Sequence, residues 1–197
     1  MSSTVLYMSM SLDGFITGPN VRPDNGLGDG GMRLHEWLFL GDADGHKSAA
    51  ERLRGVNRQI YDELMSTGAV IAGRPTFEPA GGWDGDHHDG VPIFILSHGP
   101  APEWAAAWPG VRYVSDLEVA VRDAKQAAGN GDVLVHGATL AQLALKAGLL
   151  DELEIHLIPI LLGQGTRLFE HREQELERTR VLEGEGGVTH LRYRVRY

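Results

Sequence analysis

Three short polar segments, each directly after an apolar run, carry residue types that bind phosphate. They are Gly73-Arg74-Pro75-Thr76, Ser97-His98 and Gly137-Ala138-Thr139-Leu140. Their small residues leave backbone amides accessible, and Arg74 and His98 add side chains that can bind a phosphate. Thr139 stands at the expected start of a helix, where the helix dipole favours an anion. Ordinary turn and capping chemistry explains each segment alone, but the three together favour a phosphorylated cofactor.

Two other segments match ligand-binding patterns only in part. Residues 26–31 follow the spacing G-x-G-x-x-G of dinucleotide-binding turns. No expected strand directly precedes them and Asp24 would repel phosphate, so a flexible loop is the better interpretation. Residues 84–89 contain aspartates and the pair His87-His88. Adjacent residues on a loop rarely converge on one metal ion, so we expect a solvated loop without metal, and a metal-dependent hydrolase built on His87 and His88 remains an alternative.

The composition narrows the chemistry further. The chain has 197 residues, with 18 Lys and Arg against 27 Asp and Glu, and a formal net charge of −9. Without a basic run, this charge disfavours nucleic acid as a partner. The absence of cysteine excludes disulfides, thiolate nucleophiles and cysteine-ligated metals. No apolar run approaches the about 20 residues of a spanning helix, and the first residues lack a secretory pattern. We therefore expect a cytoplasmic protein without membrane contact.

Apolar runs bounded by turn residues predict six strands in the body of the chain. Segments of helical periodicity separate several of them, and this alternation predicts a largely parallel sheet with helices on its faces. The expected strands cover residues 5–10, 69–72, 92–96, 111–114, 132–136 and 153–158.

Three helices are expected between these strands, from apolar residues that recur at helical spacing. The first covers residues 47–66, the second begins at a capping box formed by Ser115 and Glu118, and the third follows Gly137. The residues expected to face the core are Leu53, Val56, Ile60 and Leu64 in the first helix, Leu117, Ala120, Val121 and Ala124 in the second, and Leu140, Leu143 and Ala144 in the third.

The last third of the chain ends in a different pattern. Residues 190–197 alternate polar and apolar side chains with a period of two, as in a strand with one buried face. Residues 176–183 can pair with them across the glycine-rich turn at 184–187. An irregular loop at 17–32 is long for a compact protein, which is typical of a functional lid. One α/β domain spanning residues 1–197 is the expected organisation.

The order of these motifs resembles the dihydrofolate reductase-like superfamily, and more narrowly the family named for the reductase domain of bacterial riboflavin biosynthesis. The resemblance rests on residues 10–16 (MSLDGFI), 72–78 (AGRPTFE), 95–98 (ILSH), 136–140 (HGATL) and 148–169, and it covers nearly the whole chain. It implies a central, mostly parallel mixed sheet flanked by helices and closed by a C-terminal antiparallel hairpin. Members of the family reduce small heterocycles with NADPH and commonly form dimers.

The resemblance also implies roles for particular residues. Asp13 and the 17–32 loop would lie beside the nicotinamide of NADPH. Proton donation from Asp13 requires that burial raises its pKa; ordered water is the other source, and a turn-capping role for Asp13 is an equal alternative. The cofactor-binding residues would be Gly73, Arg74 and Thr76 at the phosphates, Ser97 and His98 at the 2′-phosphate, and Gly137, Ala138, Thr139 and Leu140 at the pyrophosphate.

The chain departs from the dihydrofolate reductases on the substrate side. Glu36 and Asp62 match the position of their substrate-binding carboxylate only loosely, and both fit the surface of a helix as well, so folate reduction itself is not implied. Met32, Trp37 and Trp83 could flank a planar ring, although core packing explains them equally.

The expected function is that of an NADPH-dependent reductase acting on a small pterin-like or riboflavin-precursor-like heterocycle, as a homodimer. The protein would orient the cofactor and exclude water, because the hydride chemistry belongs to the nicotinamide. A nucleotide-binding protein of the same fold without turnover is the alternative, since it would use the same phosphate contacts.

Overall fold

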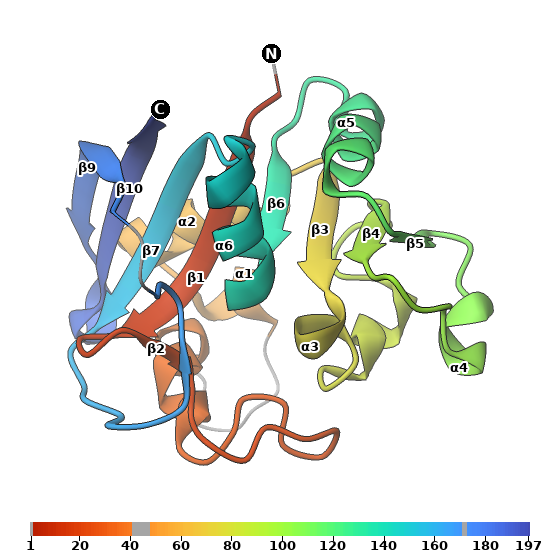
Figure 1. Cartoon of the computed structure of the whole chain (residues 1–197). Coiled ribbons are helices and arrows are strands. Elements are labelled where there is room, and N and C mark those ends of the chain that lie inside the picture. Colours follow the sequence, from red (N-terminus) through yellow and green to blue (C-terminus); the bar gives the residue numbers. More distant parts are fainter. Residues whose placement is uncertain (1, 41–47, 171–172) are drawn as a thin grey trace.

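The computed structural model describes residues 2–40, 48–170 and 173–197. In these residues eight strands form one sheet in the order β5-β4-β3-β6-β1-β7-β10-β9 (Figure 1). All neighbouring pairs from β5 to β7 are parallel, whereas β10 is antiparallel to both β7 and β9. The strands are β1 (Thr4–Ser11), β3 (Ala69–Gly73), β4 (Ile93–Leu96), β5 (Val111–Val114), β6 (Val133–His136), β7 (Glu152–Ile158), β9 (Glu175–Glu183) and β10 (Thr189–Arg196). The predicted α/β class and mostly parallel sheet are confirmed.

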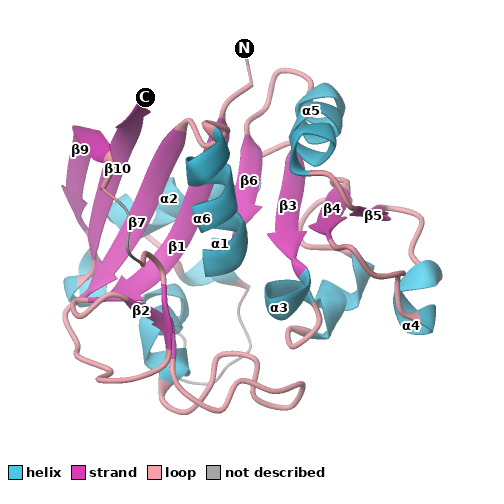
Figure 2. Ribbon diagram, viewed as in Figure 1, coloured by secondary structure: helices cyan, strands magenta, loops and turns pink. Residues whose placement is uncertain are grey.

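Helices cover both faces of this sheet (Figure 2). Figure 1 shows α5 (Leu117–Ala128) and α6 (Ala138–Ala147) on one face, with α1 (Ala49–Arg52) and α2 (Gly55–Met65) on the other. Alternate residues of β1 serve the two cores: Leu6 and Met8 pack with α5 and α6, whereas Val5 and Tyr7 pack on the opposite side. The shorter elements are β2 (Phe15–Thr17), β8 (Thr166–Arg167), η1 (Gly31–Phe39), α3 (Arg74–Phe77), η2 (Gly81–Gly85), α4 (Glu103–Ala106) and η3 (Glu185–Gly187).

The first expected helix is broken into α1 and α2, and its predicted start at residue 47 lies outside the described residues. The break lies at Leu53 and Arg54, which have extended backbone conformations. Gly55 follows directly, and its φ of +52° belongs to the left-handed region that favours glycine. A Cβ there would lie 2.2 Å from Oε1 of Glu185. Close packing against η3 therefore interrupts a segment whose apolar spacing alone predicts one continuous helix.

The other two helices occur where they were expected, with two local differences. Asp116 rather than Ser115 caps α5, because its carboxylate accepts a hydrogen bond from the backbone N–H of Val119 at 2.9 Å. In α6, Leu140 and Ala144 are buried, but Leu143 is 42% exposed. The prediction that Leu143 faces the core is wrong, because this side chain lines a surface cavity instead.

The predicted C-terminal hairpin is confirmed by the pairing of β9 with β10 across the turn that contains η3. The polar alternation along β10 marks a solvated face only in its second half, where Arg194 and Arg196 are exposed. His190 is fully buried, and its Nε2 lies 3.1 Å from Oδ1 of Asn57 in α2. The packing of α2 on this face thus buries a position that the pattern alone assigns to solvent.

The parallel strands bring their carboxyl ends to one edge of the sheet. Gly73 pairs with Leu96, and Ala72 pairs with His136, so β3, β4 and β6 all end at the same level. In open α/β sheets this edge is the usual place for a ligand. None of the helices within the described ranges is long and apolar enough to cross a membrane.

Candidate functional site

A cavity of about 690 Å³ lies at the carboxyl ends of β1, β3 and β6. The loop after β2 contributes one side of its lining, and α3 and η2 contribute another. Thr76, Trp83, His136 and Thr139 are among the residues that line it. Its volume is in the range of small-molecule and cofactor sites.

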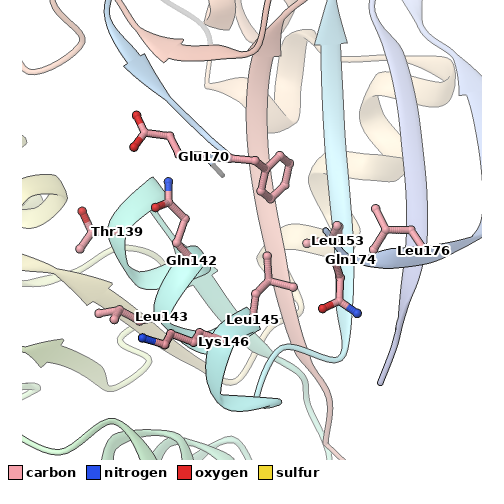
Figure 3. A pocket seen from close by; sticks show the side chains of 10 residues that line it. Thr139, Gln142, Leu143, Leu145, Lys146, Leu153, Glu170, Gln174 and Leu176 are labelled. Carbon is pink, nitrogen blue, oxygen red and sulfur yellow. The ribbon is translucent and has the colours of Figure 1, made fainter. Parts of the chain in front are cut away.

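A second cavity, of about 640 Å³, lies between α6 and strands β7 and β9 (Figure 3). Leu143 and Lys146 line it from α6, and Leu153 and Leu176 line it from the two strands. Of the residues predicted to bind cofactor, it shares only Thr139 with the first cavity. The first cavity is therefore the candidate site.

The three predicted phosphate-binding segments meet beside the first cavity. Gly137 has a φ of +93°, and a Cβ on it would lie 2.0 Å from Oγ1 of Thr76. Arg74 Nη1 donates a hydrogen bond to Oγ of Ser97 at 3.3 Å, which connects the segment after β4 to the segment after β3. Gly137 has no side chain to cap α6, so the first amides of this helix are available to an anion.

The predicted cofactor-binding residues occupy three kinds of position. Thr76, Gly137, Ala138 and Thr139 line the cavity. Gly73 and Leu140 are buried next to it, at the end of β3 and inside the first turn of α6, and support the backbone there. Arg74 and Ser97 lie outside the lining, and His98 is exposed on the loop after β4.

Arg74 is the arginine of the first of these segments, and its guanidinium already has partners within the protein. Its guanidinium forms an ion pair with Glu78 at 2.8 Å, donates to the carbonyl of Pro100 at 3.0 Å, and lies 5.8 Å from the centre of the Tyr113 ring. These contacts hold a half-buried charge between the ends of β3 and β4, where a phosphate can also approach it.

The loop between β2 and η1 folds over the cavity in a tight arrangement. Asp29 accepts hydrogen bonds from the side-chain amides of Asn20 at 2.7 Å and Asn25 at 2.8 Å. Gly28 has a φ of +69°, and a Cβ on it would lie 2.3 Å from the carbonyl oxygen of Gly18. Gly26, Gly28 and Gly31 therefore serve close packing, in agreement with our interpretation that these glycines are not a dinucleotide fingerprint.

Asp13 does not line the cavity. Its carboxylate accepts hydrogen bonds from Oγ of Ser11 at 2.6 Å and from the backbone N–H groups of Leu162 at 3.1 Å and Gly163 at 2.7 Å. These contacts, that of Ser11 first, lower the pKa of Asp13 to about 2. Proton donation from Asp13 required a pKa raised by burial, and this condition is not met, whereas the hydrogen bonds match the alternative in which Asp13 caps a turn.

The prediction that residues 84–89 form a solvated loop is wrong for both histidines. His88 is buried, with Nε2 3.1 Å from Oγ1 and from the carbonyl oxygen of Thr67. His87 Nδ1 lies 2.8 Å from His88 Nδ1, and burial together with the neighbouring histidines lowers the pKa of His87 to about 3. These two rings pack as part of the interior because η2 brings Trp83 over His87, with ring centres 4.7 Å apart.

The metal-hydrolase alternative gains no support from this arrangement. In the described part of the chain, a group of three potential metal ligands occurs at Glu154, His156 and His190, away from His87 and His88. Those three residues pack between the sheet and α2, and His190 already contacts Asn57.

Sequence reasoning missed two residues that line the cavity, His35 from η1 and His136 from the end of β6. Nδ1 of each ring is buried and has no hydrogen-bond partner among the described residues. Burial lowers the pKa of His136 to about 4 and also lowers that of His35. The position of His136 at the end of a predicted strand was the available signal, since it puts a titratable ring at the ligand edge of the sheet.

Some of the residues proposed to contact the substrate line the cavity, and the others do not. Met32 and Trp83 line the cavity, whereas Trp37 is buried and donates to Oγ of Ser9 at 3.1 Å. Glu36 and Asp62 are exposed on their helices, and Asp62 pairs with Arg58 at 2.7 Å. The surface-helix interpretation of Glu36 and Asp62 therefore fits the structure.

Comparison with protein families finds the RibD C-terminal domain, matched over residues 3–189 of the chain. No curated protein matches at a significant level.

Solved structures with similar folds belong to reductase-like proteins. A putative riboflavin biosynthesis protein from Shewanella sp. PV-4 superposes with a TM-score of 0.69, with 21% identity and 99% of each chain covered. A dihydrofolate reductase from Enterococcus faecalis, in complex with NADP(H), gives a TM-score of 0.58 with 13% identity, over 99% of this chain and 97% of the other. The RibD protein of Acinetobacter baumannii gives 0.61 with 19% identity, and the match covers all of this chain but 58% of that protein. At these identities the structures establish a shared fold.

Proposed function

The chain belongs to the RibD C-terminal domain family, and from this we propose that it is an NADPH-dependent reductase of a small heterocycle of the pterin or riboflavin-precursor type. The observation that carries the proposal is the close approach of Gly137 to Thr76 beside the first turn of α6. That approach leaves a cradle of small residues and backbone amides, which fits a pyrophosphate.

When bound, NADPH would supply the hydride, and the residues of the chain would hold and orient it. The amides of Ala138 and Thr139 would bind the pyrophosphate, with the Thr76 hydroxyl beside them. Arg74, close to Ser97 and His98, would bind the 2′-phosphate. Gly73 and Leu140 would keep the two turns in place without touching the ligand directly.

The loop between β2 and η1 would exclude water from the nicotinamide end. This loop lines the cavity through Val21, Asn25 and Leu27, and its internal hydrogen bonds fix its shape. A closed, dry cavity protects a hydride donor from side reactions and strengthens the polar contacts to the substrate. We also propose that the protein acts as a homodimer, which light scattering on the purified chain would test.

A calorimetric titration with NADPH tests the proposal, and NADPH oxidation across a panel of pterins, aminopyrimidines and quinones tests turnover. Binding of NADPH with turnover of a panel member supports the reductase. Binding without turnover of any compound favours the nucleotide-binding alternative. No binding at millimolar NADPH would overturn both.

The variant Arg74→Ala tests the 2′-phosphate assignment. We expect the dissociation constant for NADPH to rise about tenfold and that for NADH to change less than about twofold, because only NADPH carries the charge that Arg74 would bind. Equal losses for the two cofactors would refute the assignment. Arg122→Ala, which removes an exposed arginine from α5, is the matched control.

A further inference from the structure

Three potential metal ligands meet on one face of the sheet, and they are not among the residues that line the candidate site. Glu154 and His156 lie two residues apart on β7, so they point to the same face. His190 of β10 pairs directly with His156. One carboxylate oxygen and one nitrogen from each imidazole lie within 4.8 Å of one another. All three residues are buried, with exposures of 0% for Glu154 and His190 and 3% for His156.

The partners of His190 determine which of its nitrogens carries the proton. Nε2 of His190 lies 3.1 Å from Oδ1 of Asn57. The other end of this amide fixes its orientation, because Nδ2 of Asn57 donates to the carbonyl oxygen of Glu185 at 3.0 Å. Oδ1 therefore accepts a hydrogen bond from Nε2, and Nδ1 of His190 keeps a lone pair that faces His156. A ring oriented in this way through its far nitrogen is typical of a metal-binding histidine.

The cluster contains more lone pairs than N–H groups to satisfy them. Nδ1 of His156 lies 2.9 Å from Nδ1 of His190, so a neutral His156 donates from Nδ1 and keeps its lone pair on Nε2. This Nε2 atom and Oε1 of Glu154 are both buried, and neither has a hydrogen-bond partner within the described ranges. Buried polar atoms without a partner cost stability and call for an explanation. Because both atoms offer lone pairs, a cation would satisfy them.

The charges around the cluster favour a cation over a buried water molecule. Arg180 donates two hydrogen bonds to Glu63, at 2.7 and 2.6 Å, and Arg192 donates to Glu152 at 2.6 Å. Glu154 is a third carboxylate beside these two guanidinium groups, with Oε2 3.1 Å from Arg180 and 4.0 Å from Arg192. One negative charge is therefore left over beside the buried Oε1 atom. A water molecule could bridge the lone pairs, but it would not compensate this charge.

We propose that Glu154, His156 and His190 form a buried site for a divalent transition-metal ion such as Zn²⁺. Two imidazoles and a carboxylate are a ligand set that zinc accepts, with a water molecule as the fourth ligand. Ligand atoms of tetrahedral zinc lie about 2.1 Å from the ion and about 3.4 Å from one another. Movements of less than about 1 Å in each group would therefore complete the site. Such an ion binds as the chain folds, so the folded protein needs no open path to it.

The ion would connect the C-terminal hairpin to elements on the opposite side of the cluster. The ring of Trp37, in η1, lies 4.9 Å from that of His156 and 5.1 Å from that of His190, measured between ring centres. Asn57 links His190 to α2. Since η1 also lines the candidate site through His35, the ion would stabilise one part of that lining from behind. The inference does not depend on the proposed reductase function.

The test measures the zinc content and the melting temperature of the whole chain, expressed without a polyhistidine tag. The protein is unfolded with a chelator, refolded with or without Zn²⁺, and washed with a weak chelator that removes surface ions. We expect about one zinc ion per chain after refolding with zinc, and a melting temperature roughly 5–10 °C above that of the zinc-free protein. A zinc content below about 0.2 per chain would overturn the inference and favour a buried water molecule.

Substitutions locate the bound ion. Glu154→Gln keeps the shape of the side chain and removes its charge, and His156→Gln removes one imidazole, so each should weaken zinc binding at least about 100-fold. His88→Gln is the matched control, because it removes a buried imidazole that contacts Thr67 instead, and it should leave the zinc content unchanged. X-ray absorption at the zinc edge of the wild-type protein, which needs no variant to fold, should show imidazole ligands. Equal zinc affinity in the three variants, or a spectrum without imidazole, would overturn the site.

Discussion

Two parts of the cavity lining differ in the chemical groups that they offer to a ligand. The side near α6 consists of backbone amides, a glycine at positive φ and a threonine hydroxyl, all at the ends of adjacent parallel strands. The other part of the lining includes imidazole and indole rings from η1, β6 and η2, elements that are far apart in the sequence. The first arrangement suits any phosphorylated ligand that fits the edge of the sheet, whereas the second depends on the particular side chains. Cofactor binding should therefore respond to backbone changes, and substrate choice should respond to side-chain changes.

The largest expected effect comes from closing the phosphate side with one methyl group. Gly137→Ala places a Cβ where Thr76 Oγ1 lies 2.0 Å away, at a φ of +93°. Because both the contact and the conformation are unfavourable, we expect NADPH affinity to fall roughly 100-fold, with a loss of stability of about 1–3 kcal/mol.

Fluorescence titration with NADPH and urea denaturation measure the two effects. Gly110→Ala is the matched control, because a Cβ at residue 110 meets no atom within 4 Å. Retention of wild-type NADPH affinity in Gly137→Ala would mean that the cofactor does not use this turn.

Acidification is expected to destabilise the fold through the histidines whose pKa is lowered by burial, of which His136 lines the cavity. The folded-state pKa is about 4 for His136 and His190 and about 3 for His87, below the ordinary value of 6.5. Below pH 6.5 these histidines take up protons in the unfolded chain but not in the folded chain. The free energy of unfolding therefore keeps its full value above that pH. It is lost as the pH falls toward 4, at up to about 1.4 kcal/mol per pH unit for each histidine kept neutral.

Urea denaturation at a series of pH values measures this slope. His190→Leu should reduce the slope, since it removes one of the titrating groups. A free energy of unfolding that stays constant between neutral pH and pH 5 would show that burial does not keep these histidines uncharged.

The sequence predicted the phosphate side of the cavity better than the side lined by rings, because the phosphate side is built from local motifs. The motifs at residues 73–76 and 137–140 are local, because a strand, a turn and a helix start are encoded by consecutive residues, and parallel pairing then brings these turns to one edge. The structure accordingly places Gly137 against Thr76, and Arg74 within hydrogen-bond distance of Ser97. The class of fold and the hairpin followed from the same local patterns.

The positions of the imidazole and indole rings that line the cavity could not be predicted from local motifs. His35 becomes half-buried at the cavity, and His88 becomes buried beside Thr67, because η1 and the loop after η2 fold inward, and no periodic pattern encodes that packing. For Asp13 the sequence left a chemical role and a turn cap open, because the partners that favour the cap, Leu162 and Gly163, lie about 150 residues away in the sequence.

The smallest expected effect concerns Asp13. In Asp13→Asn, the hydrogen bonds to Leu162 and Gly163 are weakened, so we expect a loss of stability of about 1 kcal/mol and little change in NADPH affinity. Because Asp13 is ionised above its pKa of about 2, the pH profile of any turnover found in the panel should keep its shape. A fully folded Asp13→Asn variant without turnover would instead place Asp13 in the chemistry.

A crystal structure of the protein soaked with NADPH would locate the cofactor. We expect the pyrophosphate against the backbone N–H groups of Ala138 and Thr139, with the nicotinamide directed toward His35, His136 and Trp83. NADPH bound in the cavity of Figure 3, between α6 and β9, or an unoccupied first cavity at saturating cofactor, would contradict this placement.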